Sequence, residues 1–347
     1  MKKKIIVTSA QVPFVKGGAE LMVSMLVKNL CDRGYDTELV NIPYKWYPEE
    51  SLYDNMLAWR LLDLSESNGQ KIDLVIGTKF PSYGVRHENK VCWLMHQYRQ
   101  AYDLFDTPVG LGCTPTGARI RQNVEKYDYS TLTDSKKIYT ISENVSSRLK
   151  KYNQIDSDPL YHPPSLVGRY KSGEFGDYIV SVGRIDKLKR NDLLIEALAY
   201  CDKGVKAKIA GRGPEMENLK ALAEKCGVAD RVEFLGFVND DDLLDLYAGA
   251  FAVFFAPVDE DYGYITLEAF LSQKPLVTCS DTGGVLEFAE NSRSAFVTAP
   301  SPKELGSSIN KMYANKQLCK KMGLEGYEKV KDISWDNVID KLTETLR

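Results

Sequence analysis

Two carboxylates stand eight positions apart in the stretch VDEDYGYITLEAF, which begins at Val258. Glu260 precedes Gly263, and Glu268 follows it where a helical pattern starts. Carboxylates accept hydrogen bonds from vicinal hydroxyls, so two of them on a rigid strand–loop–helix junction could bind a ribose and a hexose together. Gly263 would let the backbone pass close to the sugar. The alternative is that Glu268 only complements the helix dipole and that Glu260 is one more surface acid.

Two cations lie five positions apart in GRIDKLKRNDLLIEA, a loop that leads into a helical pattern. Arg184 and Lys189 would lie beside the amino end of that helix, where they could hold a diphosphate without a metal ion. A solvated cationic loop explains the same residues without any ligand.

Glycines mark two further loops. In SAQVPFVKGGAE, Gly17 and Gly18 come directly before a helix, and bare backbone at a helix amino end can approach a phosphate or a sugar hydroxyl. The loop AGRGPE places Gly211 before another helix. A plain turn explains either loop as well. The first loop is not the dinucleotide fingerprint, because G-x-G-x-x-G is absent and the next strand ends at Asn41 rather than at an acid.

The elements that must position these residues follow a βαβ rhythm, in which short apolar runs alternate with amphipathic helical runs. This is the pattern of a parallel sheet covered on both faces. The predicted strands are residues 5–9, 37–41, 73–77, 91–95 and 138–142, then 178–182, 207–211, 232–236, 252–256 and 275–279. The predicted helices are residues 19–33, 144–152, 191–199, 215–226, 241–248 and 264–272, followed by a tail that is helical from residue 302 onward.

Prolines and glycines interrupt this rhythm at YHPPSLVGRYKSGEFGD, from Tyr161 to Asp177, which we interpret as a linker. A chain of 347 residues with 44% hydrophobic residues suits two domains, here 1–165 and 166–333, each doubly wound. A final segment, 334–347, opens with a Ser334 cap and has its own apolar stripe.

Charge and cysteine content narrow the class of protein. The net charge is −3, divided as +2 before residue 166 and −5 after it, so neither half looks like a nucleic-acid binder. Seven scattered cysteines without a CxxC pair suit buried free thiols in a reducing compartment. The first apolar run is too short for a signal peptide or a membrane span. We therefore expect a cytoplasmic protein.

The motifs GRIDKLK, AGRGPE, FLGFV and EDYGYITLE occur in the order and spacing of family 4 glycosyltransferases, and GGAE fits the first loop of that family. The resemblance covers nearly the whole chain and is strongest from Tyr178 to Val297. Family 4 enzymes are retaining and have the GT-B fold. The resemblance therefore implies two Rossmann-like, doubly wound domains that face a central cleft. It also implies that segment 334–347 crosses back onto the acceptor-binding domain 1–165, while domain 166–333 binds the donor.

The resemblance also assigns roles to residues. Glu260 would contact hydroxyls of the donor sugar, and Glu268 the nucleotide ribose. Arg184 and Lys189 would bind the diphosphate, and Gly18 would lie against it. The implied catalytic residues are Arg184, Lys189, Glu260 and His96, and the implied donor-binding residues are Gly17, Gly18, Gly183, Gly211, Phe237, Val238, Gly263, Tyr264, Ile265, Thr266 and Glu268.

Some of these assignments have alternatives. His96 follows the fourth predicted strand, where the family often has a histidine that faces the donor sugar, but a structural histidine is the other interpretation. Asp261 stands where the family commonly has glycine, which leaves the donor sugar open. The stretch TGGVLEF lacks the proline that frequently follows its glycines.

The implied reaction moves a hexose from a UDP- or GDP-sugar to a hydroxyl of a glycan or lipid-linked acceptor, with retention, in cell-surface polysaccharide or glycolipid synthesis. No side chain is an evident nucleophile, so we expect same-face attack in which the leaving diphosphate takes the acceptor proton. Arg184 and Lys189 would stabilise its charge, assisted by Lys16 and the amides of Gly17 and Gly18. We expect no cofactor and no divalent metal, because no aspartate pair lies in a suitable loop.

The acceptor is expected on loops of the first domain, where Tyr44, Trp46 and Tyr47 offer flat faces for sugar stacking or else belong to the core. The basic run from Arg119 to Lys151 is either a peripheral contact with the inner membrane face or a solvated surface. Two other functions stay open: a non-catalytic sugar-nucleotide-binding protein and, with less support, a Rossmann-type dehydrogenase. Turnover with an acceptor would distinguish the first from an enzyme.

Overall fold

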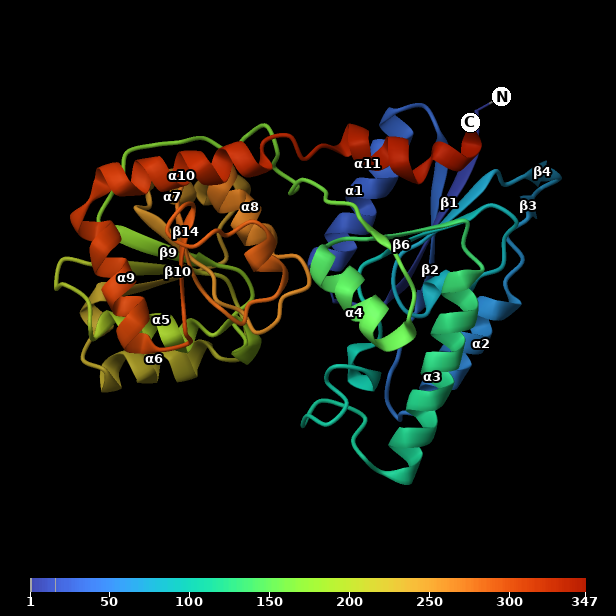
Figure 1. Cartoon of the computed structure of the whole chain (residues 1–347), viewed down its shortest axis with the longest axis horizontal. Coiled ribbons are helices and arrows are strands. Elements are labelled where there is room, and N and C mark those ends of the chain that lie inside the picture. The colour runs from blue at the N-terminus through green and yellow to red at the C-terminus, as the bar shows by residue number, and fades with distance from the viewer. Residues whose placement is uncertain (1, 16) are drawn as a thin grey trace. The chain divides into compact units, whose positions relative to one another are not determined.

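The computed structural model describes residues 2–15 and 17–347. The chain forms two units, each with its own sheet between helices (Figure 1). The first unit comprises Met1–Ser165 together with the C-terminal segment Ser334–Arg347, and the second comprises Leu166–Ile333.

The first unit is built on a six-stranded parallel sheet in the order β2-β1-β5-β6-β7-β8. Helices α1 and α11 lie on one side of this sheet and α2 and α3 on the other (Figure 1). Its strands are β1 (Lys4–Gln11), β2 (Asp36–Pro43), β5 (Leu74–Gly77), β6 (Lys90–Leu94), β7 (Lys137–Thr140) and β8 (Asp158–Pro159), with a small hairpin of β3 (Glu66–Ser67) and β4 (Gln70–Lys71). Its helices are α1 (Gly18–Asp32), α2 (Ser51–Leu61), α3 (Pro115–Thr133), α4 (Glu143–Asn153) and α11 (Trp335–Leu342), with short 3₁₀ turns η1 (Ser82–Gly84), η2 (Arg99–Ala101) and η6 (Glu344–Leu346).

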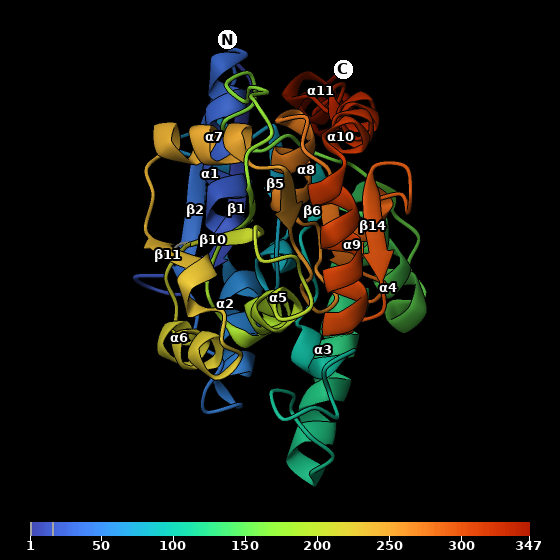
Figure 2. The same ribbon diagram turned by 90° about the vertical axis from the view of Figure 1, so that its left-hand side faces the viewer.

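The second unit repeats this plan, with strand order β11-β10-β9-β12-β13-β14 and every pairing parallel. Helices α5 and α6 lie on one side of the sheet and α7 and α8 on the other, and α9 runs beside β14 (Figures 1 and 2). The strands are β9 (Tyr178–Val182), β10 (Lys206–Ala210), β11 (Val232–Gly236), β12 (Ala252–Phe254), β13 (Leu276–Cys279) and β14 (Ala295–Thr298). The helices are α5 (Asn191–Leu198), α6 (Met216–Lys225), α7 (Asp240–Gly249), α8 (Tyr264–Leu271), α9 (Pro302–Ala314) and α10 (Lys316–Val330), with 3₁₀ turns η3 (Lys187–Lys189), η4 (Ala229–Arg231) and η5 (Gly284–Glu287).

Burial explains why these apolar runs form strands. Ile179, Val180, Val253 and Val277 are completely buried, as expected for central strands covered on both faces. Polar caps fix the helix starts: Asn239 accepts a hydrogen bond from the amide of Asp242 at the start of α7. The doubly wound fold predicted for both parts of the chain is confirmed.

Several elements were not predicted from the sequence. Helix α2 carries a stripe of buried Leu52, Met56 and Trp59, and no helix was predicted there. Helix α3 has few apolar residues, but Thr114 caps it and Pro115 occupies its first turn. Strand β14 also escaped prediction, and the C-terminal tail is broken into three helices rather than helical throughout.

Two further expectations concerned the cysteines and membrane-spanning segments. All seven cysteines are free, but Cys31 and Cys113 are exposed, so the expectation of buried thiols is wrong for these two. Within the described residues, no helix is both long enough and apolar enough to cross a membrane.

Aromatic packing holds helix α11 in the first unit. The indole of Trp335 lies 6.1 Å from that of Trp93 in β6 and 5.9 Å from the ring of His162, in each case between ring centroids. The hydroxyl of Tyr139 donates to Glu344 at 2.8 Å just beyond the helix. Val338, Ile339 and Leu342 of α11 are buried as well, so the C-terminal segment is fixed by Trp335 together with this apolar stripe.

We expect Trp335→Ala to lower the free energy of unfolding of the first unit by about 3–5 kcal/mol, because truncation of a buried indole leaves a cavity beside Trp93. Urea titrations followed by circular dichroism would measure the change. The control is Asn337→Ala on the exposed side of the same helix, which should shift stability by no more than about 0.5 kcal/mol. Equal stability of the two variants would contradict this packing.

Candidate functional site

The site residues predicted in the second unit lie on loops at the carboxyl ends of its parallel strands. The sheet order places β9 between β10 and β12, so the strand order reverses at β9, which is where open α/β sheets usually bind ligands. The loops concerned are residues 183–189 after β9, 211–215 after β10, 237–239 after β11, 255–263 after β12 and 280–284 after β13. Residues distant in sequence therefore meet at one edge of one sheet.

Glu260 is held by backbone hydrogen bonds to the loop after β13. Its amide donates to the carbonyl of Thr282 at 3.1 Å, and its carbonyl accepts from the amide of Gly284 at 2.8 Å. A Cβ at position 284 would lie 2.6 Å from the carbonyl oxygen of Asp261, so only glycine allows this close approach. The two loops thus support the position of the Glu260 carboxylate.

That carboxylate forms an ion pair with one of the two predicted cations. Nζ of Lys189 lies 2.5 Å from Oε2 of Glu260, and about a quarter of each side chain is exposed, 23% for Lys189 and 26% for Glu260. The ammonium also lies 5.2 Å from the ring centroid of Phe255. The predicted sugar-binding acid and the predicted diphosphate-binding cation are therefore in direct contact.

Asp186 organises the loop after β9, and the sequence analysis missed it. Its side chain accepts a hydrogen bond from the amide of Lys189 at 3.2 Å, and its Oδ2 lies 3.1 Å from Nε of Arg184. The Arg184 side chain is 69% exposed, so it remains open to a ligand. The sequence could have indicated this role, because an aspartate in a turn often caps the backbone amide three residues after it.

Glu268 lies in the second turn of α8. Burial raises the pKa of its carboxyl group, and the hydroxyl of Tyr247, which donates to Oε2 at 2.7 Å, opposes that increase. Tyr247 comes from α7 and is completely buried. The carboxylate of Glu268, which was predicted to accept hydrogen bonds from the ribose, is therefore held by a residue of a neighbouring helix. The sequence did not indicate this contact.

Several glycines of this edge have packing roles. A Cβ at Gly211 would lie 1.8 Å from the carbonyl oxygen of Gly183, so the loops after β10 and β9 pack backbone against backbone. Gly263 has a φ of +82° directly before α8, where an L side chain would be strained. Packing therefore requires glycine at these positions even without a ligand.

The remaining predicted donor residues differ in exposure. Phe237 is 70% exposed and lies 5.6 Å below the guanidinium of Arg212. Val238, Tyr264 and Ile265 are half-buried. Thr266 is completely buried, and its amide donates to the carbonyl of Gly263. Its role in donor binding stays a prediction.

Comparisons with known proteins address the same region. Residues 169–329 match the family described as "Glycosyl transferases group 1". The matched stretch lies within the second unit, which therefore resembles the group 1 glycosyltransferases.

Two curated proteins are similar in sequence to this chain. It is 21% identical over 309 residues to alpha-1,3/1,6-mannosyltransferase ALG2 of Dictyostelium discoideum, a match covering 76% of this chain and 72% of the relative. It is 29% identical over 209 residues to a GDP-mannose-dependent alpha-(1-6)-phosphatidylinositol monomannoside mannosyltransferase of Mycobacterium tuberculosis. That match covers 56% of this chain and 54% of the relative, so the chain spans about half of that relative's length.

A solved structure resembles the whole chain. Sucrose-phosphate synthase from Thermosynechococcus elongatus superimposes with a TM-score of 0.78 at 14% identity, covering 100% of this chain and 98% of that chain. This likeness concerns the fold alone. Together with the two doubly wound units, it confirms the predicted GT-B fold class.

The first unit of the chain holds the other predicted site residues. His96 follows β6, is half-buried, and its Nδ1 lies 2.7 Å from the carbonyl oxygen of Gln97. Gly17 and Gly18 are exposed at the start of α1, and the amide of Gly17 donates to Oε2 of Glu20 at 2.9 Å. Lys16 lies outside the described residues.

Glu20 and Lys79 form an ion pair that the sequence analysis missed. Oε1 of Glu20 accepts from Nζ of Lys79 at 2.8 Å, which ties α1 to the loop after β5. The pKa of Glu20 is lowered, since burial raises it but the lysine and the Gly17 amide outweigh that effect. The position of Lys79 directly after a buried strand was the sequence feature that could have indicated this ion pair.

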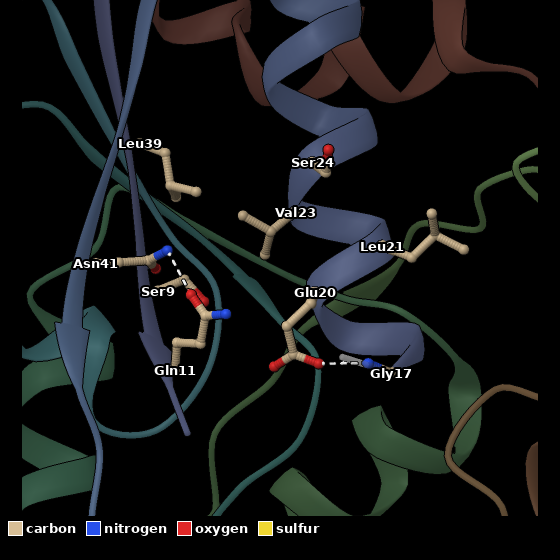
Figure 3. A pocket seen from close by; sticks show the side chains of 9 residues that line it. All are labelled: Ser9, Gln11, Gly17, Glu20, Leu21, Val23, Ser24, Leu39 and Asn41. Carbon is tan, nitrogen blue, oxygen red and sulfur yellow. Dashed lines mark hydrogen bonds between the residues drawn. The ribbon is translucent and has the colours of Figure 1, made fainter. Parts of the chain in front are cut away.

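A pocket of about 420 Å³ lies next to Glu20, between α1 and the strands β1 and β2 (Figure 3). Three residues of the strands and two of the helix give it polar groups, and the remaining lining is aliphatic. Its lining consists of Ser9, Gln11, Gly17, Glu20, Leu21, Val23, Ser24, Leu39 and Asn41. The sequence analysis did not predict this pocket.

The aromatic residues predicted to stack on an acceptor sugar divide into two kinds. Tyr44 is half-buried and packs edge-on against Phe80, with ring centroids 6.3 Å apart, so it belongs to the core. Trp46 is 39% and Tyr47 is 60% exposed, and their rings are 5.3 Å apart. Only these two keep faces open to solvent.

The basic run from Arg119 to Lys151 spans parts of α3, β7 and α4. Some of its cations have acidic partners: Arg121 pairs with Glu125 at 2.8 Å, and Lys150 with Asp156 at 2.8 Å. Membrane contact by this run stays a prediction.

A buried carboxyl group lies close to the loop that carries His96. Asp128 of α3 accepts hydrogen bonds from the hydroxyls of Tyr83 at 2.6 Å and Tyr102 at 2.7 Å. Tyr102 accepts in turn from Asn153, which also bonds to the side chain of Gln97. Burial raises the pKa of Asp128 to about 7, against the effect of the two tyrosines. The network connects α3, α4 and the residue after His96.

We expect Asp128 to make the first unit less stable as pH rises. Its folded-state pKa is above the ordinary value, so the folded state binds more protons, and this contribution is lost as pH rises from about 4 to about 7. The stability difference between the wild type and Asp128→Asn should therefore shrink, by on the order of 2 kcal/mol, from about pH 5 to about pH 8.

Thermal and urea unfolding at both pH values would measure this difference. Asp54→Asn, an exposed acid of α2, is the matched control and should show no such change. A constant difference for Asp128→Asn would mean that the carboxyl is ionised throughout.

Proposed function

We propose that the protein transfers a hexosyl group from a nucleoside diphosphate sugar, UDP- or GDP-linked, to a hydroxyl of a glycan or lipid-linked acceptor, with retention of configuration and without a divalent metal. The observation that carries this proposal is the Lys189–Glu260 pair at the carboxyl edge of the second sheet, with Arg184 on the same loop as Lys189. The two curated relatives are named mannosyltransferases, and one is named GDP-mannose-dependent, so GDP-mannose is the first donor to test. The products would belong to cell-surface polysaccharide or glycolipid synthesis.

In this proposal the charged groups divide the donor between them. Arg184 and Lys189 hold the diphosphate, Glu260 accepts from hydroxyls of the hexose, and Glu268 accepts from hydroxyls of the ribose. The side chain of Arg184 is largely exposed and free to turn toward a phosphate, whereas Lys189 would share its charge between Glu260 and the diphosphate. The ammonium group of Lys189 would thereby contact both the carboxylate that binds the sugar and the diphosphate that leaves.

The reaction step is a same-face displacement. The acceptor oxygen forms a bond to the anomeric carbon as the bond from that carbon to the phosphate oxygen breaks. The bonding electron pair leaves with the diphosphate, which takes the acceptor proton. Arg184 and Lys189 stabilise the negative charge that develops on the diphosphate oxygen.

Metal independence is part of the proposal because two cations of one loop, Arg184 and Lys189, can neutralise the diphosphate themselves. The proposal therefore assigns charge neutralisation to Arg184 and Lys189.

We expect Arg184→Ala and Lys189→Ala each to lower kcat by roughly 10- to 150-fold, because a charge-assisted contact that strengthens as the diphosphate leaves acts on rate more than on binding. Activity should persist in excess EDTA. Lys187→Ala removes an exposed cation from the same loop and should remain close to the wild type. Release of sugar from GDP-mannose and UDP-hexoses to an acceptor would be followed chromatographically.

Two results would remove this diphosphate site from the proposal. One is full activity of both variants. The other is loss of activity in EDTA that returns with magnesium or manganese. Donor binding without turnover in any acceptor mixture would instead favour a non-catalytic sugar-nucleotide-binding protein.

We expect the two glutamates to affect different parts of the donor. Glu268→Ala should weaken binding of the free nucleotide, and Glu260→Ala should reduce discrimination among sugars carried on the same nucleotide. Each lost charged hydrogen bond should cost about 1.5–3 kcal/mol. Calorimetric titration with GDP, UDP and their sugars would separate the two effects.

Glu304→Ala, an exposed acid of α9, is the control for this pair. If all three variants bind nucleotide and sugar nucleotide as the wild type does, the assignment of the two glutamates is wrong.

A further inference from the structure

We propose that the pocket between α1 and the strands β1 and β2 binds an uncharged pyranose ring of the acceptor (Figure 3). This inference rests on the proposed function for its place in the reaction, and on the first unit alone for its geometry. It concerns a pocket that no part of the sequence pattern had indicated.

The register of the sheet brings three polar side chains to one face. Ser9 of β1 pairs directly with Asn41 of β2, and Gln11 lies two residues further along β1. Side chains two apart on a strand share a face, so all three point toward α1. A polar surface thus covers the end of an otherwise apolar sheet face.

Ser9 gives the strongest indication of a ligand. Only 4% of this residue is exposed, it lines the pocket, and its hydroxyl makes no hydrogen bond to any described residue. Its oxygen is not one of the fully enclosed polar atoms that lack a partner, so it faces the open pocket. A ligand hydroxyl in the pocket could both donate to and accept from it.

The amides of Gln11 and Asn41 extend this polar surface. Nδ2 of Asn41 donates to Oε1 of Gln11 at 3.1 Å (Figure 3). That bond leaves the Gln11 amino group as a donor and the Asn41 carbonyl oxygen as an acceptor. A donor and an acceptor side by side match two vicinal hydroxyls of a sugar.

The remaining lining decides the charge and shape of the ligand. The described lining residues offer no cation to an anionic ligand, and the carboxylate of Glu20, which is paired with Lys79, can still accept from hydroxyls. Leu39 is 38% and Leu21 is 42% exposed at this pocket, and Val23 lies between them on the helix side (Figure 3). These aliphatic groups can cover the C–H face of a ring.

The volume agrees with one small ring rather than an extended chain. The pocket measures about 420 Å³, near the lower end of the range of roughly 300 to 1,000 Å³ for ligand sites. The rest of the acceptor molecule would then extend outside the pocket, past the exposed Gly17 and Gly18.

The test uses the full chain and two kinds of probe. Methyl α-D-mannopyranoside and methyl β-D-glucopyranoside are neutral rings, and glucose 6-phosphate is an anionic one. Side-chain amide signals of Gln11 and Asn41 in nitrogen-15 spectra would report binding. We expect saturable shifts with at least one neutral glycoside and weaker or no shifts with glucose 6-phosphate.

The variants are Ser9→Ala and the double variant Gln11→Ala/Asn41→Ala, compared with Gln122→Ala, an exposed amide of α3 outside the pocket. In turnover, the double variant should raise KM for the glycan acceptor about tenfold relative to Gln122→Ala, with a smaller effect on kcat. Ser9→Ala removes only the hydroxyl group, so it should weaken glycoside binding without unfolding the strand.

The outcomes of the two arms are distinct. If no sugar nucleotide is turned over, the proposed function fails, whereas the amide shifts still decide whether the pocket binds a neutral ring. If neither glycoside shifts the amide signals, or if glucose 6-phosphate binds as tightly as they do, the inference is overturned. It is equally overturned if the enzyme turns over and the double variant has the acceptor KM of Gln122→Ala.

Discussion

The half-buried ion pair between Lys189 and Glu260 joins the loop after β9 to the loop after β12, and the arrangement of the candidate donor site depends on it. A partly exposed pair contributes modestly to stability, but removal of one partner leaves a charge that must find water or another partner. A diphosphate next to Lys189 would draw on the same ammonium that neutralises Glu260. In the proposed function, binding of the diphosphate and positioning of the donor sugar would therefore be coupled through one side chain.

Backbone packing makes this coupling geometrically possible. Parallel strands end at the same edge, and the loops after β9 and β10 approach so closely that Gly211 has no room for a side chain beside Gly183. The loops after β12 and β13 show the same constraint at Gly284. Glycines that look like signs of a phosphate-binding loop are thus also what allows neighbouring loops to converge, and the charged residues are placed by that convergence.

Sequence patterns predicted what depends on local chemistry: the alternation of buried strands and helices, the linker near Ser165, and the gathering of Arg184, Lys189 and Glu260 at one edge. They failed where tertiary contacts decide. Helix α3 has little apolar periodicity and is held by contacts such as that of Asp128 with Tyr83. The contact of Tyr247 with Glu268 joins two helices through a buried hydroxyl, and no spacing rule connects those positions.

The pocket at Ser9 also could not be predicted from the sequence. Ser9, Gln11 and Asn41 are unremarkable in sequence because each occupies an ordinary position at the end of a strand. Only the pairing register of β1 with β2 puts them on one face, and only the course of α1 leaves space above them. The hydroxyl of Ser9 therefore faces the open pocket beside two amides, and these polar groups are placed together by tertiary structure alone.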